Sequence, residues 1–167
     1  MRVAYADPPY LGQARKHYQC DEIDHEALIA QLETYDCWAL SCSSPSLSTI
    51  LPMCPVGVRV MAWVKPFCAF KVNVGVAYAW EPVIVNRGRR RTREQTTVRD
   101  WVSAVITLQR GVHGAKPDAF CYWLFQVLNL NRDDEFTDLF PGSGAVSHCW
   151  DAFRQQTTLE VENADQD

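Results

Sequence analysis

The sequence predicts an α/β fold in which helices cover both faces of a mostly parallel sheet of about five strands. The first reason is that short runs rich in Val, Ile, Trp and Tyr alternate with helix-like or turn-rich segments along the chain. This alternation is typical of strands joined by right-handed helical crossovers. The second reason is composition, because 47% apolar residues, 22% charged residues and six Trp indicate a large core. We therefore expect three layers, with ligands bound beyond the carboxyl ends of the strands.

The strands and the first helix follow from local patterns. Strands are expected at residues 2–7, 37–42, 58–64, 79–85 and 135–140. Between the first two strands, Asp24 is placed to cap a helix in which Leu28, Ile29 and Leu32 share one face. The connection between these two strands is therefore a helical crossover.

The remaining helices carry clear start or stop signals. A short helix is expected around 46–51 and is closed by Pro52. Pro117 occupies the first turn of a strongly apolar helix of about 13 residues. A final helix over 145–154 follows a glycine-rich turn. The apolar character of the helix after Pro117 predicts that it is buried.

The length of 167 residues predicts a single domain, which we place at residues 1–156. The segment 86–99 breaks the apolar pattern with a run of arginines and is expected to be a mobile loop. Residues 157–167 are polar and acidic, and we expect them to form a disordered tail.

Charge and cysteine usage limit the function classes. The net charge of −4 gives no overall attraction to nucleic acid or to an anionic membrane, so such binding needs a local patch. The chain has no long apolar run and no signal-peptide pattern, so a cytoplasmic protein that binds no membrane is expected. The seven Cys form no CxxC pair and are expected to be reduced and buried. His17 and Cys20 have a metal-ligand spacing but lack a second pair, so no metal site is expected.

The motif Asp7-Pro8-Pro9-Tyr10 stands at the end of the first predicted strand. Proline cannot donate to a sheet, so the two prolines stop the strand and keep the backbone extended. They also leave carbonyl groups that can accept hydrogen bonds from a ligand's amino group. A plain strand-terminating turn, in which Asp7 caps and Tyr10 packs, is the alternative interpretation.

The stretch DLFPGSG at 138–144 combines a strand end, a glycine-rich turn and a helix start. Gly142 and Gly144 allow a tight turn and a close approach to a ligand, and the helix that follows presents free N–H groups. A carboxylate or phosphate suits this place. Because many such turns only connect a strand to a helix, this motif alone is weak support for a ligand site.

Together the two motifs resemble those of the S-adenosylmethionine (SAM)-dependent amino-methyltransferases that act on adenine N6 or cytosine N4 of DNA. DPPY at 7–10 is similar to their catalytic motif, and FPGSG at 140–144, with Asp138 before it, is similar to their cofactor motif. AKP at 115–117 resembles a further cofactor-side motif. The order, with the catalytic motif first, is similar to the beta-type permutation, which adenosine-N6 RNA methyltransferases share.

The resemblance implies a permuted Rossmann-like methyltransferase fold with SAM as the cofactor. It implies roles at the reacting amine for Asp7, Pro8, Pro9 and Tyr10. It implies cofactor contacts for Asp138, Phe140, Gly142, Ser143, Gly144, Lys116, Pro117 and Ala6. For Lys116, a solvated lysine before a proline-started helix is an equally good interpretation.

The resemblance also implies a mechanism for methyl transfer to adenine N6. The Asp7 carboxylate and the Pro8 carbonyl would accept the two N–H bonds of the amine and direct its lone pair toward the sulfonium methyl. Tyr10 would stack on the base after it leaves the helix. Trp80 and Glu81 resemble residues on a strand of the family, but a glutamate at the rim of a site is ordinary.

A cluster of basic residues is expected to bind nucleic acid. It comprises Arg87, Arg89, Arg90, Arg91, Arg93, Arg99 and Lys16. These side chains could neutralise several phosphates, which would make binding strongly dependent on salt. A solvated charged loop is the alternative interpretation.

We expect several family features to be missing. Because the sequence nearly ends after the helix at 145–154, the usual last edge strands and the ribose-binding acid are not expected. The segment 86–115 is too short for a recognition domain. We therefore expect target recognition from a second copy or a partner subunit. The alternatives to a DNA adenine-N6 methyltransferase are an RNA adenosine-N6 methyltransferase and an inactive nucleic-acid-binding module with the same fold.

Overall fold

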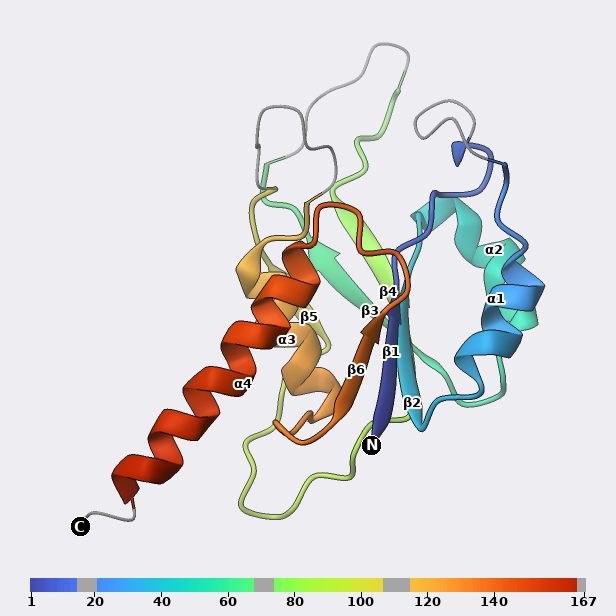
Figure 1. Ribbon diagram of the computed structural model, residues 1–167. Helices are drawn as coiled ribbons and strands as arrows, with labels where there is room; N and C mark the ends of the chain where they lie inside the picture. The colour runs from blue at the N-terminus through green and yellow to red at the C-terminus, as the bar shows by residue number, and fades with distance from the viewer. Residues whose placement is uncertain (15–20, 68–73, 107–114, 165–167) are drawn as a thin grey trace.

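Strand β1 (Arg2–Ala6) lies between two parallel neighbours in the sheet (Figure 1). The computed structural model describes residues 1–14, 21–67, 74–106 and 115–164. On one side β1 pairs with β2 (Cys37–Ser41), and on the other with β6 (Glu135–Asp138). Within the described residues, the sheet has six strands in the order β5-β3-β4-β2-β1-β6. The first strand of the chain is thus adjacent to the last one.

Strand β4 (Trp80–Asn86) is antiparallel to both of its neighbours, β2 and β3 (Arg59–Val64). Strand β5 (Trp101–Ser103) is parallel to β3 at the edge of the sheet. Of the six described strands, β4 alone is therefore reversed, and the mostly parallel sheet is confirmed. The sequence predicted about five strands and missed β5, because three residues are too few to show an alternating pattern.

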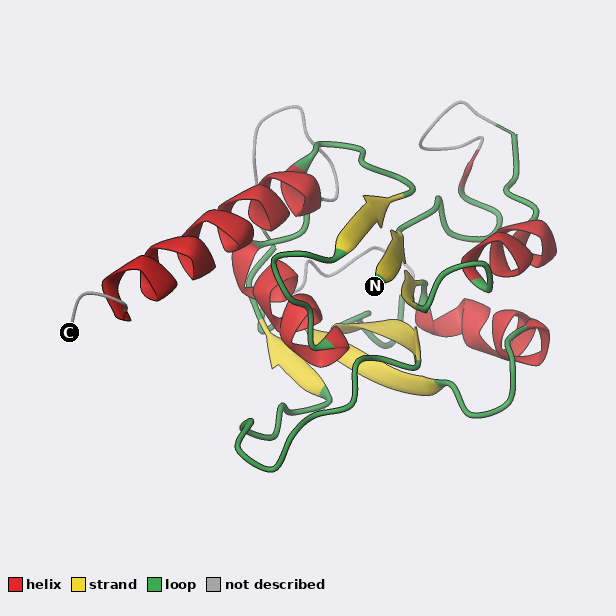
Figure 2. Cartoon of the chain, turned by 60° about the horizontal axis from the view of Figure 1, so that its bottom comes forward, coloured by secondary structure: helices red, strands yellow, loops and turns green. Residues whose placement is uncertain are grey.

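Helices cover both faces of the sheet, as the sequence predicts (Figure 2). Helices α1 (His25–Leu32) and α2 (Leu47–Ile50) lie on one face, and α3 (Asp118–Leu128) and α4 (Ala145–Ala164) lie on the other. Short 3-10 turns, Ser44–Ser46 and Leu51–Met53, flank α2. The predicted cap is confirmed, because the Asp24 carboxylate accepts a hydrogen bond from the Ala27 N–H at 3.0 Å.

Alternate residues of β1 belong to different cores. Val3 and Tyr5 pack in the core that α3 and α4 cover, whereas Ala4 and Ala6 pack in the core that α1 covers. Burial on both faces explains why this strand reads as a continuous apolar run.

Helix α4 continues to Ala164, well beyond the predicted end at residue 154. Most of the segment expected to be a disordered tail is therefore helical. The reason is that residues 145–164 contain no Gly or Pro to end the helix.

Two further expectations concern cysteines and membranes. The described cysteines are free thiols, of which four are buried and one is half-buried: Cys37, Cys42, Cys121, Cys149 and Cys54. This agrees with the reduced state that the sequence predicts for these five. None of the helices in the described ranges has the length and apolar character that crossing a bilayer requires.

The two ends of the sheet differ in which strands begin or finish there. The carboxyl end is the edge at which β1, β2 and β6 finish, and the opposite end is the edge at which they begin. Because β4 is reversed, it begins at the carboxyl end with Trp80 and finishes at the opposite end with Asn86.

Candidate active site

The glycine-rich turn after β6 is shaped by two residues in the left-handed region. Gly142 has φ +46° and Gly144 has φ +76°, backbone conformations that residues with a side chain rarely adopt. The Gly144 N–H donates to the Pro141 carbonyl at 2.6 Å, which closes the turn, and α4 begins at Ala145. The turn therefore brings the N-terminus of α4, with its free N–H groups, to the carboxyl end of the sheet.

Asp7 follows β1 at the same end of the sheet. The register pairs Tyr5 with Asp138, and the Leu139 N–H donates to the Tyr5 carbonyl at 2.9 Å. Asp7 therefore stands next to the start of the glycine-rich turn. Pro8 and Pro9 carry the backbone away from the sheet, as predicted, because no residue after Ala6 belongs to β1.

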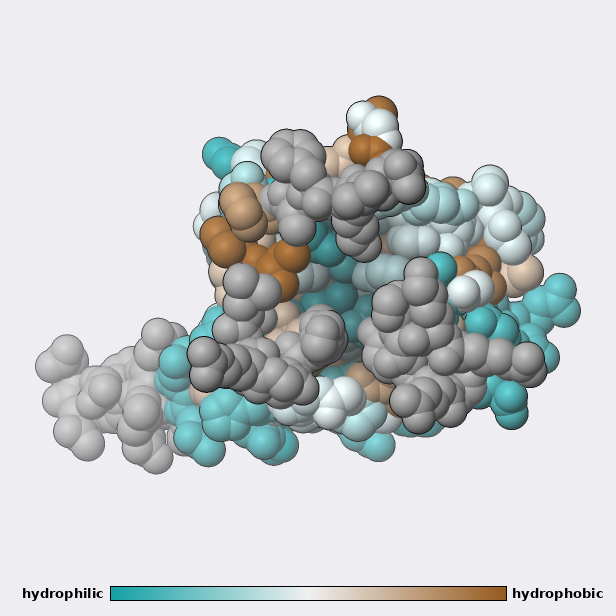
Figure 3. Space-filling view, turned by 90° about the horizontal axis from the view of Figure 1, so that it is seen from above, coloured by the Kyte–Doolittle hydropathy of each residue, from teal (hydrophilic) through white to brown (hydrophobic). Residues whose placement is uncertain are grey.

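A recess of about 70 Å³ joins the two motifs. Its walls are Tyr5, Asp7, Lys116, Asp138, Phe140, Pro141, Gly142, Ser143, Ala145 and Val146. Figure 3 looks down on this end of the molecule and shows hydrophilic residues at the bottom of a hollow. The ends of two adjacent parallel strands thus form one polar depression, as expected for a ligand site in a sheet of this kind.

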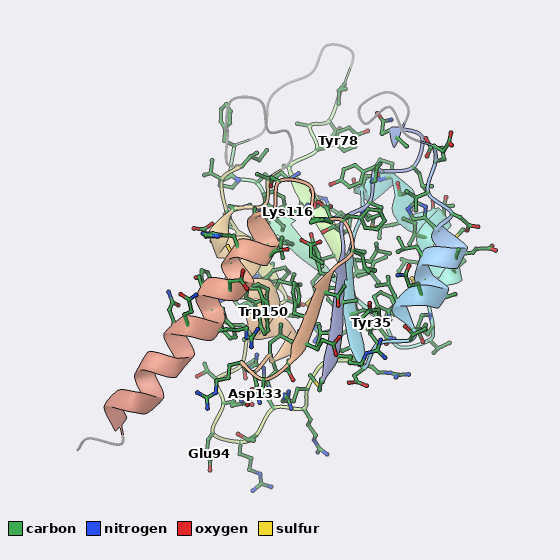
Figure 4. The ribbon with its side chains drawn as sticks, viewed as in Figure 1. Tyr35, Tyr78, Glu94, Lys116, Asp133 and Trp150 are labelled. Atoms are coloured by element: carbon green, nitrogen blue, oxygen red, sulfur yellow. The ribbon has the colours of Figure 1, made fainter. Side chains whose placement is uncertain are left out.

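Lys116 occupies the centre of this region, just before α3 (Figure 4). Its side chain is 5% exposed, and its Nζ lies 3.0 Å from Asp7 Oδ1 and also pairs with Glu81 Oε1. Burial alone would lower the pKa of Lys116, but the carboxylates of Asp7 and Glu81 raise it above its ordinary value. Lys116 is therefore a buried cation, and the solvated interpretation is wrong.

Glu81 holds the other side of this cluster. Its side chain is 4% exposed, and its Oε2 accepts a hydrogen bond from Lys65 Nζ at 3.0 Å. The side chain of Tyr10 is also hydrogen-bonded to Glu81. Burial would raise the pKa of Glu81, but Lys116 and Lys65 lower it below the ordinary value. Four charged residues and one tyrosine thus form a connected network.

Asp7 behaves differently from Glu81 although both contact Lys116. Burial raises the pKa of Asp7 to about 6, Lys116 opposes this rise, and the nearby carboxylate of Glu81 adds to it. Asp138 also faces Asp7, and burial raises its pKa too. The Asp138 carboxylate accepts from the Phe140 N–H at 3.2 Å. A carboxyl with a raised pKa in a polar depression marks a candidate functional group.

Most of the predicted site residues lie together. Asp7, Lys116, Asp138, Phe140, Gly142 and Ser143 line the recess. Gly144 closes the turn without lining the recess, and Pro117 is buried as the cap of α3. Ala6 is buried in the core on the other face. Pro8, Pro9 and Tyr10 continue from Asp7 but do not line the recess either.

The arginine-rich segment lies away from this site. It follows Asn86 at the opposite end of the sheet, where Figure 4 shows Glu94 far from Lys116. Arg89 pairs with Asp134 and donates to the Asn129 carbonyl at 3.2 Å, while Arg91 donates to the Gln126 carbonyl.

The other predicted basic residues differ in their surroundings. Arg99 lies over the ring of Trp101, whereas Arg87, Arg90 and Arg93 are exposed. Lys16 and His17 lie outside the described residues. The structure therefore does not bring the described arginines to Asp7, and their binding to nucleic acid stays a prediction.

Sequence reasoning missed three members of the site. The sequence predicts no role for Lys65 or Tyr5, and it predicts Glu81 only as an ordinary residue at the rim of the site. A buried glutamate inside the apolar run of β4 was a usable signal, because glutamate is rarely buried without a cationic partner. Of its two cationic partners, Lys116 belongs to the AKP motif, whereas Lys65 has no signal in the sequence. Within the described parts of the chain, no group of three or more His, Cys, Asp or Glu is arranged to hold a metal ion.

Comparison with solved structures finds similar chains, among them two crystal structures. The M1.HpyAVI–SAM complex has a TM-score of 0.58 and 16% identity, over 92% of this chain and 78% of that chain. M1.HpyAVI has a TM-score of 0.56 and 14% identity, over 92% of this chain and 76% of that chain. No protein-family model matches the sequence, and no curated protein matches it. At these identities the similarity establishes the fold alone, which is the Rossmann-like α/β fold that the sequence predicts.

Proposed function

We propose that the protein is a SAM-dependent methyltransferase that transfers a methyl group to adenine N6 in DNA. The observation that carries this proposal is the recess in which Asp7, the acid of DPPY, faces the turn of FPGSG. The fold shared with the M1.HpyAVI–SAM complex supports it. A strand-terminating turn alone would not require Asp7 to lie beside the glycine-rich turn and a buried lysine.

The residues of the recess fit part of a SAM molecule. The N–H groups at the start of α4 suit its carboxylate, and the Asp138 carboxylate can accept hydrogen bonds from hydroxyl or amino groups. A recess of about 70 Å³ is much smaller than an ordinary ligand pocket of roughly 300 Å³ or more. The exposed residues Pro141, Gly142 and Ser143 border its open side, so the rest of the ligand would lie across this turn.

The chain's own residues would align the amine and accept its proton. SAM supplies an electrophilic methyl carbon on its sulfonium sulfur. The Asp7 carboxylate and the Pro8 carbonyl each accept a hydrogen bond from one N–H group of the target amine. These two hydrogen bonds direct the lone pair of the amine nitrogen toward that carbon. Bound SAM would supply this methyl group to the amine nitrogen and leave as S-adenosylhomocysteine, and Asp7 would accept the proton that the amine loses. The raised pKa of Asp7 makes it a better proton acceptor than an ordinary aspartate.

Exposed aromatic side chains at the carboxyl end support a nucleic-acid substrate. Phe67, Tyr78 and Trp80 are 69%, 54% and 39% exposed. Phe67 follows β3, which finishes at this edge, Tyr78 precedes β4, and Trp80 is the first residue of β4. Figure 4 shows Tyr78 above Lys116. Aromatic rings of this kind can stack on unpaired bases.

Target recognition is proposed to come from a second copy or a partner subunit. Among the described residues between β4 and α3, the structure has only the short strand β5. A separate recognition domain needs about 50 residues or more.

Nucleoside analysis tests the proposal. The protein is incubated with methyl-tritiated SAM and either DNA or RNA, and the polymer is digested to nucleosides. Label in N6-methyladenine from DNA is expected, with a loss of at least about 100-fold in Asp7→Ala. The Asp134→Asn variant, altered at the opposite end of the sheet, serves as the matched control and should keep its activity.

Each other outcome of this experiment has a clear meaning. Label that appears only with RNA would assign the RNA adenosine as the substrate. Absence of label from both polymers, together with no SAM binding by calorimetry, would overturn the enzyme assignment and favour the inactive nucleic-acid-binding module.

A further inference from the structure

Glu81 receives donors from three separate segments of the chain. Lys116, Lys65 and Tyr10 all direct a polar hydrogen to its carboxylate. This is possible because β4 is reversed, so that its first residues lie at the carboxyl end of the sheet, where Glu81 is paired with Trp63 of β3. Glu81 itself does not line the recess. Its contacts therefore act on the site through other side chains.

The ammonium of Lys116 has little freedom to move. It lies between Asp7 and Glu81, and it also stands over the rings of Trp63 and Phe120, 5.1 Å and 5.5 Å from their centroids. The rings and the two carboxylates define its position. A change at Glu81 therefore changes how strongly this ammonium is directed toward Asp7.

Lys65 balances the charge of the cluster. Two carboxylates, Asp7 and Glu81, share the ammonium of Lys116, and Lys65 brings a second cation to Glu81 Oε2. Without Lys65, Glu81 would attract Lys116 more strongly and leave Asp7 less well compensated. The groups that act on Asp7 are Lys116 before α3, Glu81 of β4, Asp138 of β6 and Tyr5 of β1.

We propose that Glu81 is a positioning residue for the DPPY motif. Through Lys116 it places a cation on Oδ1 of Asp7 and leaves Oδ2 for the target amine, and through the hydrogen bond to Tyr10 it orients the aromatic ring. Lys65 neutralises part of the charge of Glu81 and so determines how strongly the Lys116 ammonium interacts with Asp7. This proposal rests on the proposed function for the identity of the amine, but the charge relation between Glu81, Lys65 and Asp7 holds independently of it.

Titration of Asp7 in Glu81→Gln and Lys65→Met tests the charge relation. The chain is labelled with ¹³C at its aspartate carboxyls, the Asp7 signal is assigned with Asp7→Asn, and its pKa is followed by NMR. Loss of the Glu81 charge should lower the pKa of Asp7, and loss of the Lys65 charge should raise it, each by about one pH unit.

The opposite directions separate positioning from a structural role. A purely structural role for Glu81 predicts that neither substitution moves the Asp7 titration, or that both move it the same way, and either result would overturn the proposal. The Lys65→Met variant keeps the test decisive where Glu81→Gln does not fold, because the Lys65 side chain is 18% exposed. Asp134→Asn is the matched control and should leave the Asp7 titration unchanged.

Methyl transfer gives the second readout. The pH below which kcat/KM for methyl transfer falls should be lower in Glu81→Gln and higher in Lys65→Met, with SAM affinity unchanged.

The Tyr10→Phe variant tests the hydrogen bond to Glu81, because it keeps the aromatic ring but loses that bond. It should raise KM for the polymer more than it lowers kcat, and a fall in kcat alone would contradict the orienting role. Absence of methyl transfer in the unchanged protein would refute the proposed function, while the NMR titration would still decide the role of Glu81.

Discussion

Each end of the sheet holds an aspartate that is paired with cations, but the two aspartates differ in how fully they are satisfied. At the opposite end, Asp134 pairs with both Arg89 and the N-terminal ammonium, and its other oxygen accepts from the Asn131 N–H at 2.7 Å. At the carboxyl end, Asp7 has one ammonium, which it shares with Glu81.

The pKa shifts of these two aspartates have opposite directions. Burial would raise the pKa of Asp134, but the hydrogen bonds from Arg89, Asn131 and the N-terminus lower it below the ordinary value. Burial raises the pKa of Asp7 to about 6 because one shared cation does not offset it. A fully satisfied aspartate stabilises the fold, whereas an under-compensated one is available for chemistry.

Substituting Lys116 by Met should have the largest effect on stability. It leaves the carboxylates of Asp7 and Glu81 without their shared cation, so we expect the free energy of unfolding to fall by about 3 kcal/mol at pH 8. The pKa of both acids then rises in the folded state, so this loss grows as pH rises and shrinks toward pH 5. Urea unfolding at both pH values measures it. A loss that is equal at pH 5 and pH 8 would contradict the assigned charge states.

Substituting Asp134 by Asn should destabilise the protein by about 2 kcal/mol at pH 7 with no effect on methyl transfer. Arg89 and the N-terminus are partly exposed, so water limits this loss. Because the folded pKa is below the ordinary value, the stabilisation by Asp134 is present above pH 4 and is lost as pH falls further. The comparison of the two ends predicts that the destabilisation shrinks at low pH in both variants, but in different ranges: already toward pH 5 for Lys116→Met, and only below pH 4 for Asp134→Asn. Reduced methyl transfer by the folded Asp134→Asn variant would contradict the assignment of a purely stabilising role to Asp134.

The raised pKa of Asp7 predicts an acid limb in the rate of methyl transfer. Only the carboxylate form of Asp7 can accept the proton that the amine loses, so kcat/KM should fall about tenfold per pH unit below about pH 6. The measurement uses saturating SAM and a short DNA substrate. A profile that is flat down to pH 5 would show that Asp7 is ionised like an ordinary surface aspartate.

Removing the exposed arginines of the opposite end should have the smallest effect on catalysis. Arg90→Ala combined with Arg93→Ala should leave kcat unchanged, because both residues lie at the other end of the sheet from Asp7. The prediction that they contact phosphates is tested by the salt dependence of DNA binding, whose slope should fall by about one per contact. An unchanged slope would assign the segment to a solvated loop.

Much of the architecture could be predicted from the sequence because its signals are local. The five expected strands agree with the observed strands within two residues at each end, since runs of Val, Ile and Trp bounded by Pro or Gly are typical of buried strands. The pairing of β1 with β6 was expected from the resemblance rather than from the pattern itself. The sequence could not show that the arginine-rich segment is far from the site, because this depends on the direction of β4.

The charge network of the site was only partly visible in the sequence. Asp7 and the glycine-rich turn carry motifs that local chemistry explains, but Glu81 and Lys65 have no motif. They meet Lys116 and Tyr10 only because β3 and β4 pair in a particular antiparallel register. Long-range register depends on packing of the whole sheet, and no short segment records it.

Residue types alone are enough to end β1 at two prolines and to place a glycine turn after β6, because proline cannot donate to a sheet and residues at positive φ favour glycine. The charges that surround Asp7 are instead set by how the strands pair in space. Reversal of β4 brings Glu81 to the carboxyl end and sends the arginines away from it. The pKa of Asp7, and with it the proposed chemistry, depends on that placement, since electrostatic interactions depend on distance in space rather than along the chain.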